Sequence, residues 1–174
     1  METWKEFDHN EISHSAAHHL MAVDDLIRKF GYARVSDVAR MLNITRGSVS
    51  ISLQPLKKAG LILQDENRHI RLSPDGNHLV AAIKTKRVLM QKLFHQVLGV
   101  DAIQAEIDAC KLEHLVSNTV AQKLITFLKF VESEEPAVVE FRKAMRSYAM
   151  TCDVNSAKCA SCQVTGCMAD AVSG

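Results

Sequence analysis

The sequence lacks a large excess of charge of either sign, a long apolar run and any internal repeat. Its 174 residues have a formal net charge of +1, with 47% hydrophobic and 24% charged residues. This balance excludes a disordered or uniformly basic chain, and the length allows one domain or two small ones. No stretch is long enough to span a membrane, and the first residues lack the segments of a signal peptide. We therefore expect a cytoplasmic protein.

The sequence also lacks the usual signatures of an enzyme. It has no glycine-rich nucleotide-binding loop and no recognisable acid–base constellation. Cysteine is scarce, because Cys110 is the only one before residue 151. In a cytoplasmic protein, five cysteines indicate metal or redox chemistry rather than a disulfide framework. We therefore expect no catalytic residue, no small-molecule substrate and no membrane partner.

The first part of the chain has the pattern of a helix-turn-helix. Apolar residues at helical spacing predict a helix over roughly residues 10–30, ended by Gly31. A short helix with Ser36 as its N-cap follows, and Thr45 caps a longer helix that runs through Lys58. Two helices of these lengths joined by a tight turn are typical of DNA-binding helix-turn-helix units.

The next segment, "LILQDENRHIRLS", predicts two strands, Leu61–Gln64 and His69–Ser73, joined by a polar turn. A hairpin in this place is a wing. From residue 35 to 73 there are six basic and three acidic residues, a local excess of +3 that suits phosphate contacts. Duplex DNA is therefore the favoured partner, and a winged helix used only for protein contacts is the alternative. The side chains expected at bases and phosphates come from the longer helix and the wing: Arg46, Ser48, Ser50, Ile51, Gln54, Lys57 and Arg68.

Pro55 lies inside this presumed recognition helix. Proline removes one backbone hydrogen bond and clashes with the preceding turn, at a cost of about 3 kcal/mol in a regular helix. We therefore expect that the helix bends at Pro55 or that its readable part ends early.

The chain from residue 74 to about residue 150 is predicted to be helical. A long helix begins at "SPDG" and runs to about Leu98. Its buried side is expected to consist of Leu79, Ile83, Leu89, Leu93, Phe94 and Val97. Further helices are expected over Ala102–His114, after a cap at Ser117, and from Pro136. The predicted fold class is therefore mainly α, with a winged helix-turn-helix domain over residues 1–74, a helical domain over 75–150 and a cysteine-rich tail over 151–174.

The segment "DACKLEH" places three residues with ligand chemistry on one predicted helix. Cys110, Glu113 and His114 stand at positions i, i+3 and i+4, and the face that carries Ile103 and Ile107 is expected to point inward. A thiolate, a carboxylate and an imidazole at this spacing can converge on one ion. A buried free cysteine beside a core histidine is the simpler interpretation.

The first predicted helix carries another pair of histidines. His14 and His18 are four residues apart and lie away from the main apolar stripe. They are therefore free to face a second helix, although histidines near an N-terminus are often only solvated.

The order and spacing of "GYARVSDVARMLNITRGSVS", the wing, "LSPDG", "LGVD" and "DACKLEH" resemble the diphtheria toxin repressor family of iron- and manganese-dependent regulators. The resemblance covers roughly residues 10–130. It implies a homodimer built on the helices after the wing, so that residues 75–150 form a metal-binding and dimerisation domain. It also implies that two winged helices read a palindromic operator when divalent metal is bound, as in a transcriptional repressor.

The resemblance further implies a set of metal ligands. Cys110, Glu113 and His114 match the metal-binding motif of the family, and His18 falls where the first helix supplies a ligand, usually methionine or aspartate. Nitrogen, sulfur and oxygen donors in this combination suit Fe(II), Co(II), Ni(II) or Zn(II) better than Mn(II), which prefers more oxygen. We therefore expect a divalent transition metal, with Fe(II) favoured over Mn(II).

Four positions bear on a second metal and on manganese. Arg87 stands where the family has a histidine on the long helix, and Gln91 replaces a neighbouring acidic ligand of the iron-dependent branch. A second metal is therefore expected to be lost or rebuilt, with the charge of Arg87 as a substitute and Glu106 as an auxiliary ligand. Met21, where manganese regulators carry an acidic ligand, argues against manganese.

The tail "TCDVNSAKCASCQVTGC" has four cysteines within seventeen residues: Cys152, Cys159, Cys162 and Cys167. Their C-x6-C-x2-C-x4-C spacing favours an iron–sulfur cluster, with a structural zinc ion as the alternative. Incidental free thiols are the simplest alternative. The tail would add a redox input to the metal response, or act as the only sensor if Arg87 has silenced the other site. The competing function is an iron–sulfur redox protein or cluster carrier that uses the winged helix only for docking.

Overall fold

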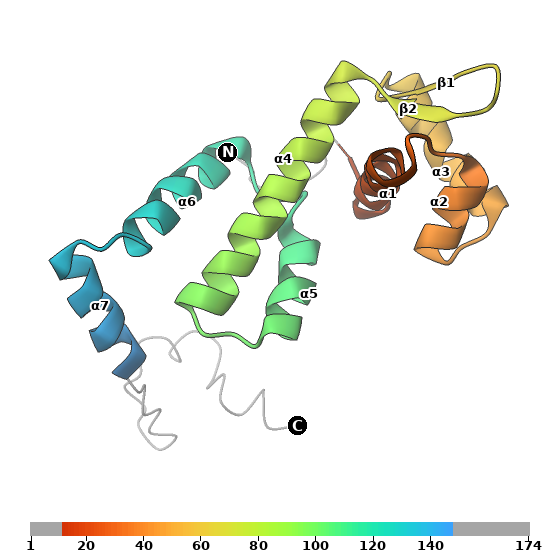
Figure 1. Cartoon of the computed structure of the whole chain (residues 1–174). Coiled ribbons are helices and arrows are strands. Elements are labelled where there is room, and N and C mark those ends of the chain that lie inside the picture. Colours follow the sequence, from red (N-terminus) through yellow and green to blue (C-terminus); the bar gives the residue numbers. More distant parts are fainter. Residues whose placement is uncertain (1–11, 148–174) are drawn as a thin grey trace, which may run out of the picture. The chain divides into compact units, whose positions relative to one another are not determined.

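The structure is a computed structural model that describes residues 12–147 (Figure 1). The chain divides into two compact units, one that ends at Phe130 and one that begins at Val131. Among the described helices, none is long and apolar enough to cross a membrane.

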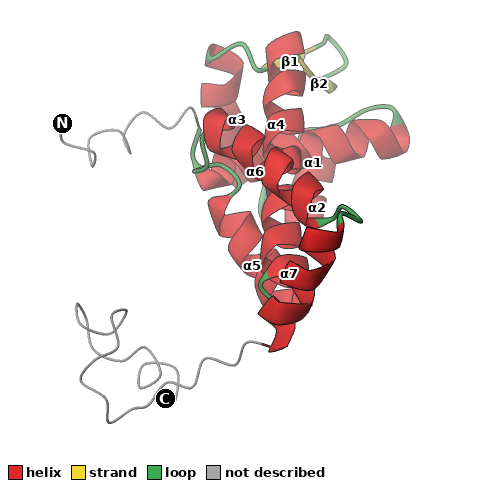
Figure 2. Ribbon diagram, turned by 90° about the vertical axis from the view of Figure 1, so that its left-hand side faces the viewer, coloured by secondary structure: helices red, strands yellow, loops and turns green. Residues whose placement is uncertain are grey.

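The first unit contains most of the described elements. In chain order these are α1 (His14–Phe30), α2 (Val35–Leu42), α3 (Arg46–Lys58), β1 (Ile62–Gln64), β2 (Ile70–Leu72), α4 (Pro74–Gln91), the π-helical segment η2 (Lys92–Val97), α5 (Ala102–Leu112) and α6 (Asn118–Val131), whose last residue opens the second unit. The second unit contains α7 (Pro136–Ser147). The mainly helical class predicted from the sequence is confirmed, and Figure 2 shows helix almost throughout the described residues.

The ends of α1 and α3 follow from their capping residues. The Ser13 side chain accepts a hydrogen bond from the Ala16 amide at the start of α1, and Gly31 ends that helix with a φ of 80°. Thr45 accepts from the Ser48 amide at the start of α3, as predicted. Each cap satisfies an amide that the first turn of a helix leaves without a partner.

The prediction that Ser36 caps α2 is wrong. The helix begins two residues earlier than a cap at Ser36 would give, and the side chain of Arg34, at the N-cap position, makes no capping hydrogen bond. The reason is that Ala33 forms an isolated β-bridge with Ile70, so the chain is extended up to Arg34 and turns into the helix immediately afterwards.

The two strands form an antiparallel hairpin at the start of α4 (Figure 2). The register pairs Ile62 with Leu72 and Gln64 with Ile70. Each strand lies within its predicted range and is shorter by a residue or two. This hairpin is the predicted wing.

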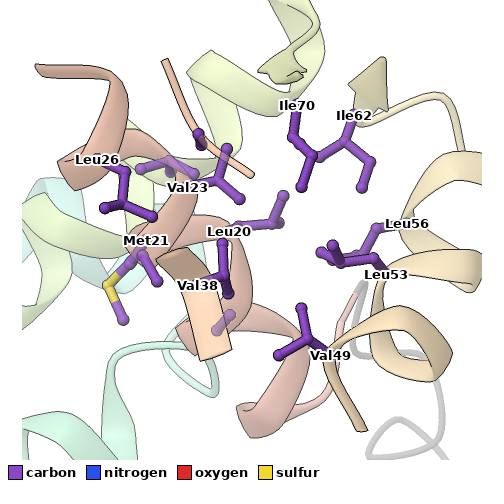
Figure 3. Close-up of a cluster of buried hydrophobic side chains, with 14 of the residues drawn as sticks. Leu20, Met21, Val23, Leu26, Val38, Val49, Leu53, Leu56, Ile62 and Ile70 are labelled. Atoms are coloured by element: carbon purple, nitrogen blue, oxygen red, sulfur yellow. The ribbon is translucent and has the colours of Figure 1, made fainter. Parts of the chain in front are cut away.

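One hydrophobic core joins the hairpin to the first three helices (Figure 3). Its members are almost fully buried and come from α1, α2, α3, both strands and the first half of α4: Leu20, Val23, Leu26, Val38, Val49, Leu53, Leu56, Ile62, Ile70, Val80 and Ile83. Because α1 and α3 share this core, they move together as parts of one body.

Helix α3 continues through Pro55 to Lys58. The helix is therefore not interrupted at the proline. Leu53 and Leu56 on either side of Pro55 are buried, whereas Pro55 itself is exposed, so burial of its neighbours keeps the helix intact despite the missing hydrogen bond.

The prediction that Ile103 and Ile107 point inward is wrong, because their side chains are 73% and 44% exposed. The buried residues of α5 are instead Ala105 and Ala109, and Glu113 at the C-cap of the helix is also buried. Alanines bring one helix close to another, and α5 packs against α4 along this face. The predicted long helix also differs in its last part, where α4 gives way to the π-helical segment η2.

Candidate metal centre and nucleic-acid interface

Helix α1 is attached to α4 by an ion pair in which Asp24 is buried and Lys84 is partly exposed. Asp24 Oδ2 accepts a hydrogen bond from Lys84 Nζ at 2.7 Å and from Arg28 Nε at 2.8 Å. Burial alone would raise the pKa of Asp24, but the hydrogen bonds from Lys84 and Arg28 outweigh it and lower the pKa. Lys84 also donates to Asp25. These contacts connect α1, which carries the histidines, to α4.

His14 and His18 lie one turn apart on α1 and meet Cys110 of α5. The His18 Nε2 atom is 3.2 Å from the Cys110 Sγ atom, although the two residues are 92 positions apart in the sequence. One ligand atom from each of His14, His18 and Cys110 lies within 4.8 Å of the other two. We call these three residues the α1–α5 cluster.

His114 and Glu113 lie beside this cluster. The imidazole ring of His114 has its centroid 5.0 Å from that of His14. The His114 Nδ1 and Glu113 Oε1 atoms are buried and have no hydrogen-bond partner. A buried polar atom without a hydrogen-bond partner lowers the stability of the folded protein by about 1–3 kcal/mol. A ligand that binds these two atoms would remove that cost. A nitrogen and an oxygen in this state fit a metal ion of the kind that the sequence predicts.

Arg87 of α4 neutralises the carboxylates next to the cluster. Its Nε atom donates to Glu106 Oε1 at 2.9 Å, its Nη2 atom donates to the same oxygen, and its Nη1 atom is 3.5 Å from Glu113 Oε2. Burial alone would lower the pKa of Arg87, but the hydrogen bond to Glu106 and the charge of Glu113 raise it overall. Arg87 is therefore a cation held between Glu106 of α5 and Glu113 at the C-cap of that helix. Met21, the position where manganese regulators carry an acidic ligand, is buried in the apolar core.

The environment of the cluster favours its uncharged forms. Burial, and then the charge of His14, lowers the pKa of His18 and of His114. Burial, and then the charge of Glu113, raises the pKa of the Cys110 thiol. Burial also raises the pKa of Glu113 despite the opposing charge of Arg87. Neutral imidazoles have a lone pair free for a metal, whereas the thiol must release its proton on binding.

The residues predicted to contact DNA are all exposed. Those from α3 lie outside its buried stripe of Val49, Leu53 and Leu56, and Ile51 is 73% exposed. The exposed set consists of Arg46, Ser48, Ser50, Ile51, Gln54, Lys57 and Arg68. An exposed apolar side chain such as Ile51 among polar ones is suited to contact with a thymine methyl group.

The wing is held against α3 by side-chain hydrogen bonds. Lys57 Nζ donates to Gln64 Oε1, and Gln64 Nε2 donates to the Arg68 carbonyl oxygen at 3.2 Å. Arg68 itself has a φ of 62° at the tip of the hairpin. Gln64 thus connects Lys57 of α3 to the backbone of Arg68 in the hairpin turn. This connection fixes the turn of the wing relative to α3.

Comparisons with known proteins agree with this architecture. A family model described as the metal binding and dimerisation domain of iron dependent repressors matches residues 73–136. The transcriptional regulator MntR of Listeria welshimeri is 30% identical over 122 residues, which are 70% of this chain and 84% of that protein. The chain belongs to the diphtheria toxin repressor family of metal-dependent regulators.

Two further relatives define the extent of the likeness. The diphtheria toxin repressor of Corynebacterium diphtheriae is 28% identical over 94 residues, and the match covers 54% of this chain but 42% of the relative. A crystal structure of the metal-dependent transcriptional regulator MtsR has the same fold, with a TM-score of 0.60 and 23% identity. The match covers 66% of this chain and 54% of the MtsR chain. The chain thus spans about half the length of these two longer relatives.

Membership of the family confirms several predictions. The chain is a DNA-binding transcriptional regulator and not an enzyme, and its family binds divalent metals. The comparisons give no support to the alternative of an iron–sulfur redox protein or carrier. Cys152, Cys159, Cys162 and Cys167 lie outside the described residues, and the match of the family model ends before them. The predicted domain limits remain predictions.

His14 is the residue that the predicted ligand set omits. The sequence contains a signal for it, because His14 and His18 stand at i and i+4 on one face of α1. The resemblance to the family points only to the position of His18, and His14 is recognised only once the side chains of α1 and α5 are seen to meet.

Proposed function

We propose that this regulator acts as a metal-responsive homodimer on palindromic operators, most simply as a repressor. An ion bound by His18, Cys110, Glu113 and His114 would connect α1 to α5 in each protomer. The observation that supports this proposal best is the 3.2 Å separation of His18 Nε2 and Cys110 Sγ. A bound ion supplies a strong attraction between donors on two separate helices.

The connection from metal to DNA passes through the core of the winged helix. Helix α1 shares that core with Val49 and Leu53 of α3, so fixing α1 on α5 also fixes α3. In a dimer built on the helices after the wing, this sets the separation of the two α3 helices. A coupling free energy of about 1–3 kcal/mol between metal and DNA corresponds to a 5- to 150-fold change in affinity.

Exposed apolar side chains in the region of the family match support a dimer. They lie on α4, α5 and α6 and on the loop after η2: Val88, Leu98, Ile103, Ile107 and Val120. An apolar surface of this kind is typical of a surface that pairs with another copy of the chain. This also accounts for the outward direction of Ile103 and Ile107.

The donor set supports Fe(II) over Mn(II). Two imidazoles and a thiolate outnumber the single carboxylate, whereas Mn(II) prefers oxygen ligands. At each half-site, Gln54 would pair with adenine and Arg46 with guanine or phosphate, while Ser48, Ser50, Ile51, Lys57 and Arg68 would complete the contacts.

The test is operator binding by wild-type protein and by Cys110→Ser, measured anaerobically with and without Fe(II). The operator is first selected from a random duplex library with the wild-type protein. We expect Fe(II) to raise the affinity of the wild type tens-fold and to leave Cys110→Ser unchanged. His78→Ala, an exposed histidine of α4, is the matched control and should respond like the wild type. Equal responses of wild type and Cys110→Ser would contradict the proposal.

The tail would provide a second input through an iron–sulfur cluster, with zinc as the alternative. Its support is the number and spacing of its four cysteines. Protein purified without oxygen distinguishes the two by its ultraviolet–visible spectrum and its iron, zinc and sulfide content. A brown protein that contains acid-labile sulfide indicates an iron–sulfur cluster, and a colourless protein with one zinc ion indicates a zinc site. A protein with neither would contradict a second input from the tail.

A further inference from the structure

We propose that His14 is a metal ligand, so that the ion is held by three imidazoles and one thiolate, from His14, His18, His114 and Cys110. This inference rests on the proposed function, because it concerns the same site, with His14 in place of Glu113 as the fourth ligand. In the proposed function, α1 supplies one imidazole nitrogen to the ion. With His14 as a ligand, α1 supplies two, and nitrogen becomes the main donor atom of the site.

The geometry groups His14 with two of the predicted ligands. His14, His18 and Cys110 form a trio whose ligand atoms lie within 4.8 Å of one another, and neither Glu113 nor His114 belongs to this trio. Donor atoms that share one ion at about 2.0–2.3 Å are separated by roughly 3–4 Å, so small side-chain rotations close the cluster.

The rings around His14 explain how His114 joins the set. The centroid of the His14 ring is 4.4 Å from that of His18 and 5.0 Å from that of His114. The His14 ring is therefore in contact with the rings of both predicted imidazole ligands. A buried Nδ1 atom of His114 without a partner is the second observation that points to a ligand at this place.

Glu113 is in a different position from the histidines. Its Oε2 atom lies 3.5 Å from Arg87, which also holds Glu106, whereas its Oε1 atom is buried without a partner. In the proposed ligand set Glu113 keeps Arg87 in place, and the four nitrogen and sulfur donors bind the ion. Four donors of this type suit the tetrahedral geometry of Zn(II) or Co(II), and they are unfavourable for Mn(II).

The test uses the full-length chain in which the four tail cysteines are replaced by serine, because tail thiols would otherwise bind the probe metal. Co(II) is the probe, since its visible and near-ultraviolet absorption reports both the coordination number and a thiolate ligand. The variants are His14→Ala, Cys110→Ser and the control His78→Ala. X-ray absorption of the Co(II) proteins counts the imidazole ligands.

We expect three imidazoles in the parent chain and two in His14→Ala, with a Co(II) affinity lower by about tenfold or more, since even outer-shell changes have effects of that size. The thiolate absorption should remain in His14→Ala and vanish in Cys110→Ser. His78→Ala should match the parent chain.

The possible failures are distinguishable. If His14→Ala keeps the affinity and imidazole count of the parent chain while Cys110→Ser loses the thiolate absorption, His14 is not a ligand but the α1–α5 metal site stands. If Cys110→Ser also leaves the spectrum unchanged, the site itself is wrong, and the proposed function fails together with this inference.

Discussion

The winged-helix region and the region where α1 meets α5 are built on opposite principles. The first is closed by a continuous apolar core, from Leu20 of α1 to Ile83 of α4. The second consists of histidines, a thiol, a guanidinium and two carboxyl groups, of which that of Glu113 is buried and that of Glu106 is partly exposed, and it includes two buried polar atoms without partners. Apolar packing stabilises a structure whether or not an ion is bound, whereas a polar cluster with unsatisfied donors and acceptors is stabilised by a suitable partner. The difference separates a rigid DNA-reading unit from a junction that an ion can tighten.

The largest effect should come from the rigid region. Leu53→Ala removes a side chain that is 2% exposed and packs in the core that α3 shares with α1. We expect a loss of about 2–5 kcal/mol in the free energy of unfolding, because the deletion leaves a cavity. Urea denaturation of the metal-free protein measures it. The loss of stability should be the same with and without metal. A loss found only in the metal-bound protein would show that the winged-helix core also depends on metal, which contradicts the difference between the two regions.

The opposite result is expected at the junction. Divalent metal at about 100 times its dissociation constant should raise the free energy of unfolding of the wild type by about 2.7 kcal/mol. His18→Ala should lose most of this increase and keep the stability of the metal-free protein. Thermal unfolding with and without Co(II) measures both quantities, in a chain without the tail cysteines. An equal metal response in His18→Ala would show that the ion binds elsewhere.

The winged-helix region was also the more predictable of the two from the sequence. Thr45, Gly31 and the alternating residues of the wing determine local structure, and the helices and strands lie within a few residues of their predicted ends. Ser36 was mistaken for a cap because the bridge between Ala33 and Ile70 is a long-range contact. Such a contact leaves no local signal in the sequence.

The junction was predictable only in part. The spacing of Cys110, Glu113 and His114 indicated a metal site, but the inward face of α5 was assigned to Ile103 and Ile107. The assignment failed because hydrophobicity does not distinguish a core from a surface that pairs with another chain. The close approach of His14 and the contacts of Arg87 depend on how three helices pack.

An intermediate effect is expected at the ion pair that attaches α1 to α4. Asp24→Asn removes the charge that Lys84 and Arg28 contact, and we expect a loss of about 1–3 kcal/mol at neutral pH. The folded protein has a lowered pKa for Asp24, so the stabilisation is present above the ordinary aspartate pKa of about 3.9 and is lost as the pH falls through the folded value. Urea denaturation at pH 7 and in acid should therefore show a difference between wild type and variant that shrinks below about pH 4.

The smallest effect on stability should come from the pair of Arg87 and Glu106. Both side chains are partly exposed, so Glu106→Gln should change the free energy of unfolding by about 0–1 kcal/mol. Its effect on metal should be clearer, because Arg87 then has Glu113 as its remaining acidic partner and is drawn closer to it. If Glu113 were a ligand, this competition would weaken Co(II) binding, whereas a site of three imidazoles and a thiolate would keep its affinity. Titration of Glu106→Gln with Co(II), beside the exposed control Glu140→Gln, therefore separates the two ligand sets by a change that leaves the protein folded.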